Sequence, residues 1–136
     1  MPSSSVEFGR IQIRRRISFE VEHFTPAFMP IYFERLLKPS KGLGETDETA
    51  VAAAIAKLGP ALDVLNAMLE GKTYFVAEEF TLADLTFLPY VARFGDLKIG
   101  DMLASRENVA AWYARCADRP SWKYAMARKA VDRAPK

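Results

Sequence analysis

The segment Phe80-Thr81-Leu82-Ala83-Asp84-Leu85 is the most informative part of this chain, because it marks the start of an apolar helix. Thr81 and Asp84 are spaced as a capping box. In such a box the Thr hydroxyl accepts from the backbone N–H of the third helical residue, and the Asp carboxylate accepts from the N–H of Thr81. Phe80 and Leu85 stand where a hydrophobic staple would hold the incoming chain. Capping accounts for Asp84 better than a role as a catalytic acid.

The helix that follows is predicted over residues 81–94. It is predicted to be buried nearly all round, since residues 82–91 include few polar side chains. Downstream, Ser105 is predicted to cap a helix that runs through Asp118, and Ser121 to cap a last short helix. No segment alternates apolar and polar residues convincingly enough to predict a strand.

Upstream of the segment, hydrophobic spacing of three and four predicts two longer helices. The first spans about residues 11–38 and contains Pro26 and Pro30, which predict a kink or a break into two helices. The second begins near Thr46-Asp47-Glu48 and ends before Gly71, and Gly59-Pro60 predicts a bend in it. The chain is therefore predicted to be all-α, a single bundle of about five to six helices.

Composition limits the classes of function. Half of the 136 residues are hydrophobic and 12% are aromatic, which indicates one folded domain. The net charge of +2 is too small to indicate a nucleic acid or an anionic membrane as partner. No uninterrupted apolar run reaches the roughly 20 residues of a membrane span. With one cysteine and no secretory signal, the protein is predicted to be cytoplasmic.

Few residues suggest chemistry. His23 is the only histidine, which excludes a Cys/His metal cluster, and its place among apolar residues predicts a structural role in the core. Cys116 has no CxxC partner and is predicted to be a buried small hydrophobe. Met29, Phe33 and Leu37 are four residues apart and form one stripe on a helix. On sequence grounds alone, this stripe is predicted to be part of the core.

The sequence from Glu70 to Asp84, with its Tyr74-Phe75-Val76-Ala77 run, resembles the centre of the helical C-terminal domain of glutathione transferases. Flanking segments fall in the same order and spacing as in that family. They are EVEHFTP at 20–26, FERLLKP at 33–39, Lys57-Leu58 followed by LDVL at 62–65, and DRPSW at 118–122. The resemblance is closest to the phi-like, plant-type class and its bacterial relatives, and it covers roughly Ser18 to Ala127. It divides the chain into a poorly matched lead-in at 1–17, of which residues 1–10 are expected to be frayed, the domain at 18–130 and a tail at 131–136.

The resemblance implies a parent reaction, the attack of glutathione thiolate on a hydrophobic electrophile, which is a detoxification chemistry. Positions matching Phe33 and Leu37 form the wall of the family's apolar substrate pocket, and Met29 continues that stripe. Arg93 matches another pocket position, where the family carries a less charged residue. Asp84 matches a folding element of the family's core. The resemblance assigns no catalytic residue and no metal ligand to this chain.

In that family a thioredoxin-like N-terminal domain binds glutathione, the co-substrate, and carries the Ser, Tyr or Cys that activates its thiol. About seventeen residues precede the matching region here, fewer than the roughly thirty of a βαβ unit. The chain is therefore expected to bind no cofactor alone and to be nearly inactive. A homo-oligomer or a thioredoxin-like partner is expected to cover its exposed apolar face. The alternatives are a stand-alone interaction module and a carrier of hydrophobic small molecules.

Overall fold

The computed structural model describes the backbone of residues 2–76 and 78–133, and the side-chain surroundings of residues 6–76 and 78–128. Within these ranges the chain is helical and contains no strand. The elements are α1 (Pro2–Phe19), η1 (Glu20–Phe24), α2 (Thr25–Tyr32), η2 (Phe33–Leu37), α3 (Lys38–Ser40), α4 (Glu48–Met68), α5 (Leu82–Val91), α6 (Gly100–Ala104), α7 (Glu107–Ala117) and α8 (Pro120–Arg133). The run from α1 to α3 is one continuous helix, so the described chain has six helices and the all-α prediction is confirmed.

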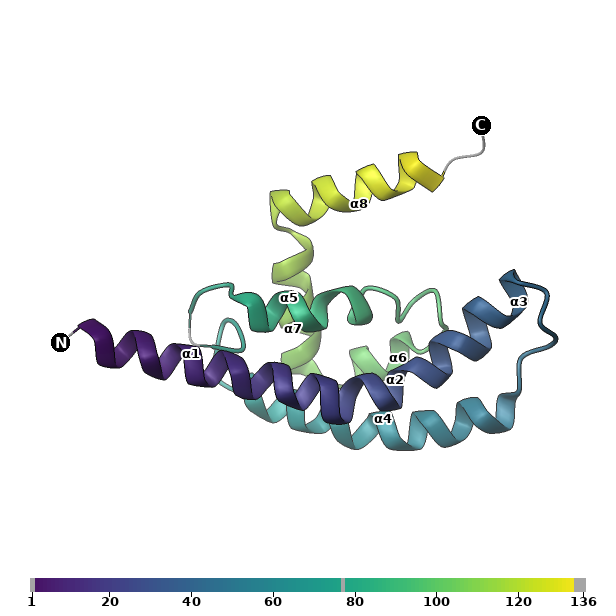
Figure 1. Ribbon diagram of the computed structural model, residues 1–136, viewed down its shortest axis with the longest axis horizontal. Coiled ribbons are helices and arrows are strands. Elements are labelled where there is room, and N and C mark those ends of the chain that lie inside the picture. Colours follow the sequence, from purple (N-terminus) through teal and green to yellow (C-terminus); the bar gives the residue numbers. More distant parts are fainter. Residues whose placement is uncertain (1, 77, 134–136) are drawn as a thin grey trace.

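The first long helix is not broken at its prolines. Pro26 and Pro30 lack the N–H that would continue the helical hydrogen bonds, and a π-helical turn lies on each side of them, η1 before and η2 after. Figure 1 shows that the run turns between α2 and α3 rather than at a gap. Residues 1–10, expected to be frayed, instead belong to α1 from Pro2 onwards. Of the expected tail at 131–136, residues 131–133 belong to α8, and residues 134–136 lie outside the described residues.

Helix α4 begins as the sequence predicts. The carboxylate of Asp47 accepts from the N–H groups of Thr49 at 3.0 Å and Ala50 at 3.2 Å. The expected bend at Gly59-Pro60 does not interrupt α4, which runs unbroken to Met68. Gly71 follows the helix with φ at +69°, a left-handed conformation that suits glycine.

By length and composition alone, α4 could also cross a membrane. The sequence analysis did not single it out, because it contains no uninterrupted apolar run of about 20 residues. Core helices of folded domains meet the same criterion. In this structure α4 has the pattern of a core helix. Its buried side chains are Val51, Ala54, Leu58, Ala61, Leu62 and Leu65, and they face the core, while Lys57 and Asp63 are exposed.

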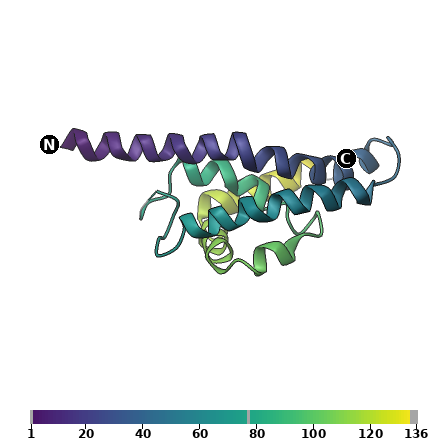
Figure 2. The same ribbon diagram turned by 90° about the horizontal axis from the view of Figure 1, so that it is seen from below.

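The core lies where α2, α4, α5 and α7 meet. Helix α2 packs along α4, and both views show the two helices side by side with α5 adjacent to them (Figures 1 and 2). Phe24 contacts Phe87 edge-on with ring centroids 5.5 Å apart, and Phe75 contacts Trp112 at 5.0 Å. The first pair joins the first helix to α5, and the second joins the loop that precedes α5 to α7. All four rings belong to one apolar cluster.

The start of α5 carries both halves of the capping box. Thr81 accepts from the N–H of Ala83 at 3.3 Å, and the Asp84 carboxylate accepts from the N–H of Thr81 at 2.8 Å. The same carboxylate accepts from the N–H of Phe75 at 3.0 Å and from the indole N–H of Trp112 at 2.8 Å. Asp84 is 0% exposed, so these donors replace its water. One buried carboxylate thus joins α5 to α7 and to the preceding loop.

Several expected details of the C-terminal half are wrong. Helix α5 is not buried all round, since Leu82 and Leu85 are exposed, and the ring of Phe80 contacts Tyr74 and Arg119. Ser105 ends α6 instead of capping α7, and its hydroxyl donates to the carbonyl of Met102. Five residues from Gly100 form α6, which the sequence did not predict, and α8 extends over 14 residues.

Polar contacts fasten the loops to the bundle. The Arg106 guanidinium donates to the carbonyls of Gly59 at 3.2 Å and Met102 at 3.0 Å, and it pairs with Asp63 at 2.9 Å. This side chain connects the start of α7 to α4 and α6. In a separate contact, Arg35 donates to the carbonyl of Leu97 at 2.7 Å and so holds the segment after α5 against η2.

Glu34 provides a second link between the first helix and α4. Its carboxylate accepts from the backbone N–H of Asp47 at 2.8 Å and from the ammonium of Lys38 at 2.9 Å. The bond from the Asp47 N–H, followed by the bond from Lys38, lowers the pKa of Glu34 below its usual 4.5. The ionised form of Glu34 therefore favours the folded state.

Candidate functional site

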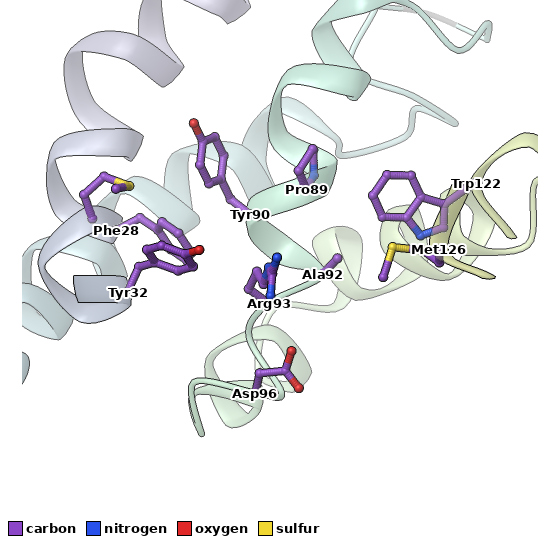
Figure 3. A pocket seen from close by; sticks show the side chains of 10 residues that line it. Phe28, Tyr32, Pro89, Tyr90, Ala92, Arg93, Asp96, Trp122 and Met126 are labelled. Carbon is purple, nitrogen blue, oxygen red and sulfur yellow. The ribbon is translucent and has the colours of Figure 1, made fainter. Parts of the chain in front are cut away.

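A cavity of about 320 Å³ lies between α2, α5 and α8. Its lining residues are Phe28, Met29 and Tyr32 from α2, Pro89 and Tyr90 from α5, Ala92, Arg93 and Asp96 from the segment after α5, and Trp122 and Met126 from α8. Figure 3 shows the α2 and α8 side chains on opposite sides, with Arg93 between them. The volume and the mainly apolar walls are typical of a small-molecule pocket.

Helix spacing builds each wall. Phe28 and Tyr32 are one turn apart on α2 and their rings are stacked, with centroids 6.1 Å apart. Tyr90 of α5 meets Phe28 nearly edge-on at 5.1 Å. On the other side, Trp122 and Met126 are one turn apart on α8. The pocket therefore has an aromatic wall on one side and an indole with a flexible thioether on the other.

Two charged groups interrupt the apolar lining. The guanidinium of Arg93 lies over the ring of Tyr32, 5.9 Å from the centroid, and the residue is half-buried. Asp96 is exposed. Burial, and after it the charge of Asp96, raises the pKa of Tyr113 on α7. Of the two charged residues, Arg93 is therefore less exposed to solvent than Asp96.

The predicted site residues separate into two groups. Met29 and Arg93 line the pocket, whereas Phe33 and Leu37 do not. Met29 is 38% exposed and Phe33 is 42% exposed, so the stripe faces outwards and does not belong to the core. The sequence analysis missed Tyr32, Tyr90 and Trp122. Tyr32 could have been found from its place three residues after Met29, on the adjoining face of the same helix.

The other candidate residues lie elsewhere. Cys116 is fully buried as predicted, and burial raises the pKa of its thiol to about 12. His23 is exposed, against the predicted core position, and its Nε2 lies 3.9 Å from the Glu22 carboxylate. Its ring lies beside that of Phe19, with the centroids 5.1 Å apart, while the buried residues of η1 are Glu20 and Phe24.

The described side chains of the pocket are suited to binding a ligand rather than to catalysing a reaction. In the part of the chain that the structure describes, no group of three or more His, Cys, Asp or Glu side chains could hold a metal ion. Among the side chains that line the pocket, none is a Ser, Thr, Cys or His. The arrangement can enclose an aromatic or aliphatic molecule and contact it with one cation.

Comparison with known proteins agrees with this architecture. The family model described as "Glutathione S-transferase, C-terminal domain" matches residues 23–120. A glutathione S-transferase from Hyoscyamus muticus is 36% identical over 107 residues, which are 79% of this chain and 50% of that protein. Glutathione S-transferase 3 from Zea mays is 33% identical over 113 residues, with 82% and 50% covered. The chain spans about half the length of these curated relatives.

Solved structures give the same result. Glutathione S-transferase I from maize, in complex with an atrazine glutathione conjugate, superposes with a TM-score of 0.81 at 28% identity and covers 88% of this chain and 55% of that one. A glutathione transferase from Populus trichocarpa superposes with a TM-score of 0.81 at 27% identity, with 88% and 55% covered. The relatives named here are plant proteins, in agreement with the resemblance to the phi-like class. The chain therefore belongs to the glutathione S-transferase family and corresponds to its helical C-terminal domain.

Proposed function

We propose that this domain supplies the hydrophobic-substrate side of a glutathione transferase site. The observation that carries the proposal is the apolar pocket between α2, α5 and α8. In the parent reaction, glutathione thiolate attacks an apolar electrophile. Here the helical domain would hold the electrophile, and a thioredoxin-like unit would hold glutathione and activate its thiol.

The exposed apolar side chains support a covering partner. From the pocket, Met29 is followed one turn later by exposed Phe33 on the first helix, and Pro89 is preceded one turn earlier by exposed Leu85 on α5. Large apolar patches are seldom left open on a soluble monomer, and these exposed side chains extend the apolar lining of the pocket. We assign it to a thioredoxin-like unit, since the chain spans about half the length of its relatives. Homo-oligomerisation would cover the same surface in the absence of that unit.

Sedimentation velocity across micromolar concentrations tests whether the exposed apolar side chains bind a partner. We expect self-association of this chain, and a weaker association for the double variant M29S/F33S. A matched exposed pair remote from the pocket, Val64→Ser with Leu43→Ser, is the control. A monomer at every concentration would count against the assignment.

Ligand titration tests the pocket itself. Trp122 lines the pocket, whereas Trp112, the other tryptophan, is fully buried. Phenylnaphthylamine, a neutral aromatic dye, should therefore quench Trp122 emission, and Trp122→Phe should abolish the quenching. Calorimetric titration of this chain with glutathione should show no binding. Saturable glutathione binding would contradict the assignment of the thiol site to a separate unit.

Ligand carriage without chemistry is the second candidate function. It rests on the same mainly apolar pocket, which would hold a hydrophobic molecule whether or not a reaction follows. Adding a thioredoxin-like domain from a relative, and then measuring conjugation of an electrophile, separates the two. Restored conjugation supports the transferase role, and dye binding without conjugation supports carriage. For either function we propose a cytoplasmic location, consistent with a single buried cysteine.

A further inference from the structure

Arg93 is a feature of the pocket that an electrophile of purely apolar character does not explain. The residue is half-buried, and Figure 3 shows its side chain between those of α2 and those of α8. A cation in such a place loses part of its hydration, which is unfavourable unless a partner compensates. Among the described residues, no carboxylate lies within 4.0 Å of it, and its recorded neighbour is the face of Tyr32.

We propose that Arg93 selects an aromatic ligand that carries one anionic group, a carboxylate or a sulfonate. The inference rests on the proposed function of the pocket and specifies the ligand class that it takes. The aromatic part would lie against Phe28, Tyr90 and Trp122, and the anionic group would face the guanidinium.

Geometry and charge both favour this orientation. A guanidinium presents several N–H donors in a planar fork that matches the two or three oxygens of a carboxylate or sulfonate. Its position over Tyr32 restricts its rotamers, so less entropy is lost when the anion binds. The apolar rings of the walls are less polarisable than bulk water, which strengthens the charge–charge attraction beside them.

Asp96 is the one carboxylate among the lining residues, and it would repel an anion. It is exposed, so water and salt screen its charge more than they screen that of half-buried Arg93. Its charge also acts on Tyr113 of α7, whose pKa it raises together with burial. Asp96 therefore weakens anion binding at the rim without cancelling the attraction at Arg93.

Two dyes with the same ring system provide the test. Anilinonaphthalene sulfonate carries a sulfonate, and phenylnaphthylamine lacks it. Both are titrated by quenching of Trp122 emission against the unmodified chain and against Arg93→Gln, Arg93→Lys and Asp96→Asn. Arg14→Gln is the control, because it removes one exposed cation on α1 that does not line this pocket.

Arg93→Gln should weaken the sulfonate dye about tenfold, the effect of losing about 1.4 kcal/mol of charge-assisted contact. It should change the neutral dye less than twofold. Arg93→Lys should retain part of the preference, Asp96→Asn should tighten the sulfonate dye, and Arg14→Gln should change neither dye. Far-UV circular dichroism and the unchanged neutral dye show that the variants fold.

The failures are distinguishable. If Arg93→Gln alters both dyes equally, or neither, the pocket binds aromatic molecules but Arg93 does not select the anion, and the inference is overturned. If neither dye quenches Trp122 in the unmodified chain, the proposed pocket function fails and the inference fails with it.

Discussion

Replacing Asp84 by Asn tests the central claim about the fold, that one buried carboxylate organises the start of α5. The carboxylate accepts from the N–H of Thr81 on one oxygen, and from the N–H of Phe75 and the indole N–H of Trp112 on the other. Asn can keep one oxygen acceptor for Phe75 and Trp112. Its amide N–H₂ would then face the N–H of Thr81, which places two donors against each other.

The magnitude follows from these three contacts. Hydrogen bonds to a charged group contribute about 1.5–3 kcal/mol and neutral ones about 1 kcal/mol. Two bonds weakened by about 1 kcal/mol each and one donor left unsatisfied give a loss of about 3 kcal/mol. The neutral amide is cheaper to bury than a carboxylate, which offsets part of this. We expect Asp84→Asn to lower the free energy of unfolding by about 2 kcal/mol, a large share of the roughly 5–15 kcal/mol of a typical domain.

Equilibrium urea unfolding, followed by far-UV circular dichroism and by tryptophan emission, measures the change. Asp84→Ala should be more destabilising than Asp84→Asn, because it leaves all three donors without an acceptor and opens a cavity. The matched control is Asp118→Asn, whose carboxylate is exposed and pairs only with Lys123. If Asp84→Asn unfolded at the same urea concentration as Asp118→Asn, the assigned role of the carboxylate would be wrong.

Three further results are expected. Arg106→Ala should lower the thermal midpoint of unfolding by several degrees, and Arg106→Lys by nearly as much. Neither alanine nor lysine can reproduce the hydrogen bonds that the Arg106 guanidinium makes to α4 and α6. Equal thermal midpoints for the unmodified protein and both variants would refute this. Glu34 has a folded-state pKa below its usual 4.5, so its stabilising effect is present above that pH and is lost as pH falls through the folded-state pKa. The stability gap between the unmodified protein and Glu34→Gln should therefore narrow below pH 4.5 in acid titrations of unfolding. Cys116 should resist a thiol reagent at pH 8 until urea unfolds the chain, since burial raises the pKa of its thiol to about 12; rapid modification of the native protein would contradict this.

Local sequence signals were sufficient to predict where a helix begins or ends when a capping residue lies at that end. Asp47 and Thr81 each precede an apolar run and each accepts from backbone N–H groups of the first turn in the structure. Such caps involve residues within three positions of one another, so the sequence alone contains both partners. The same holds for Gly71, whose left-handed backbone follows α4.

The continuity of the first helix was not predictable in this way. Pro26 and Pro30 predict a kink or a break into two helices, because each removes a backbone donor, and the family resemblance favours the kink. The helix continues because π-helical turns flank them and because Phe24, Phe28 and Ile31 remain packed in the core. Packing of this kind depends on residues of α4 and α5, which no local pattern includes.

The helical class, the caps and the resemblance to the C-terminal domain of glutathione transferases could all be inferred from the order of the residues. Which side chains share the pocket could be seen only in the folded chain. Met29 and Arg93 meet Trp122 there, while Phe33 lies outside, although Met29 and Phe33 occupy one stripe. The physical reason is that a stripe fixes the face of one helix, whereas a pocket depends on how α2, α5 and α8 approach one another. That approach is set by long-range contacts such as those of Phe28 with Tyr90 and of Asp84 with Trp112.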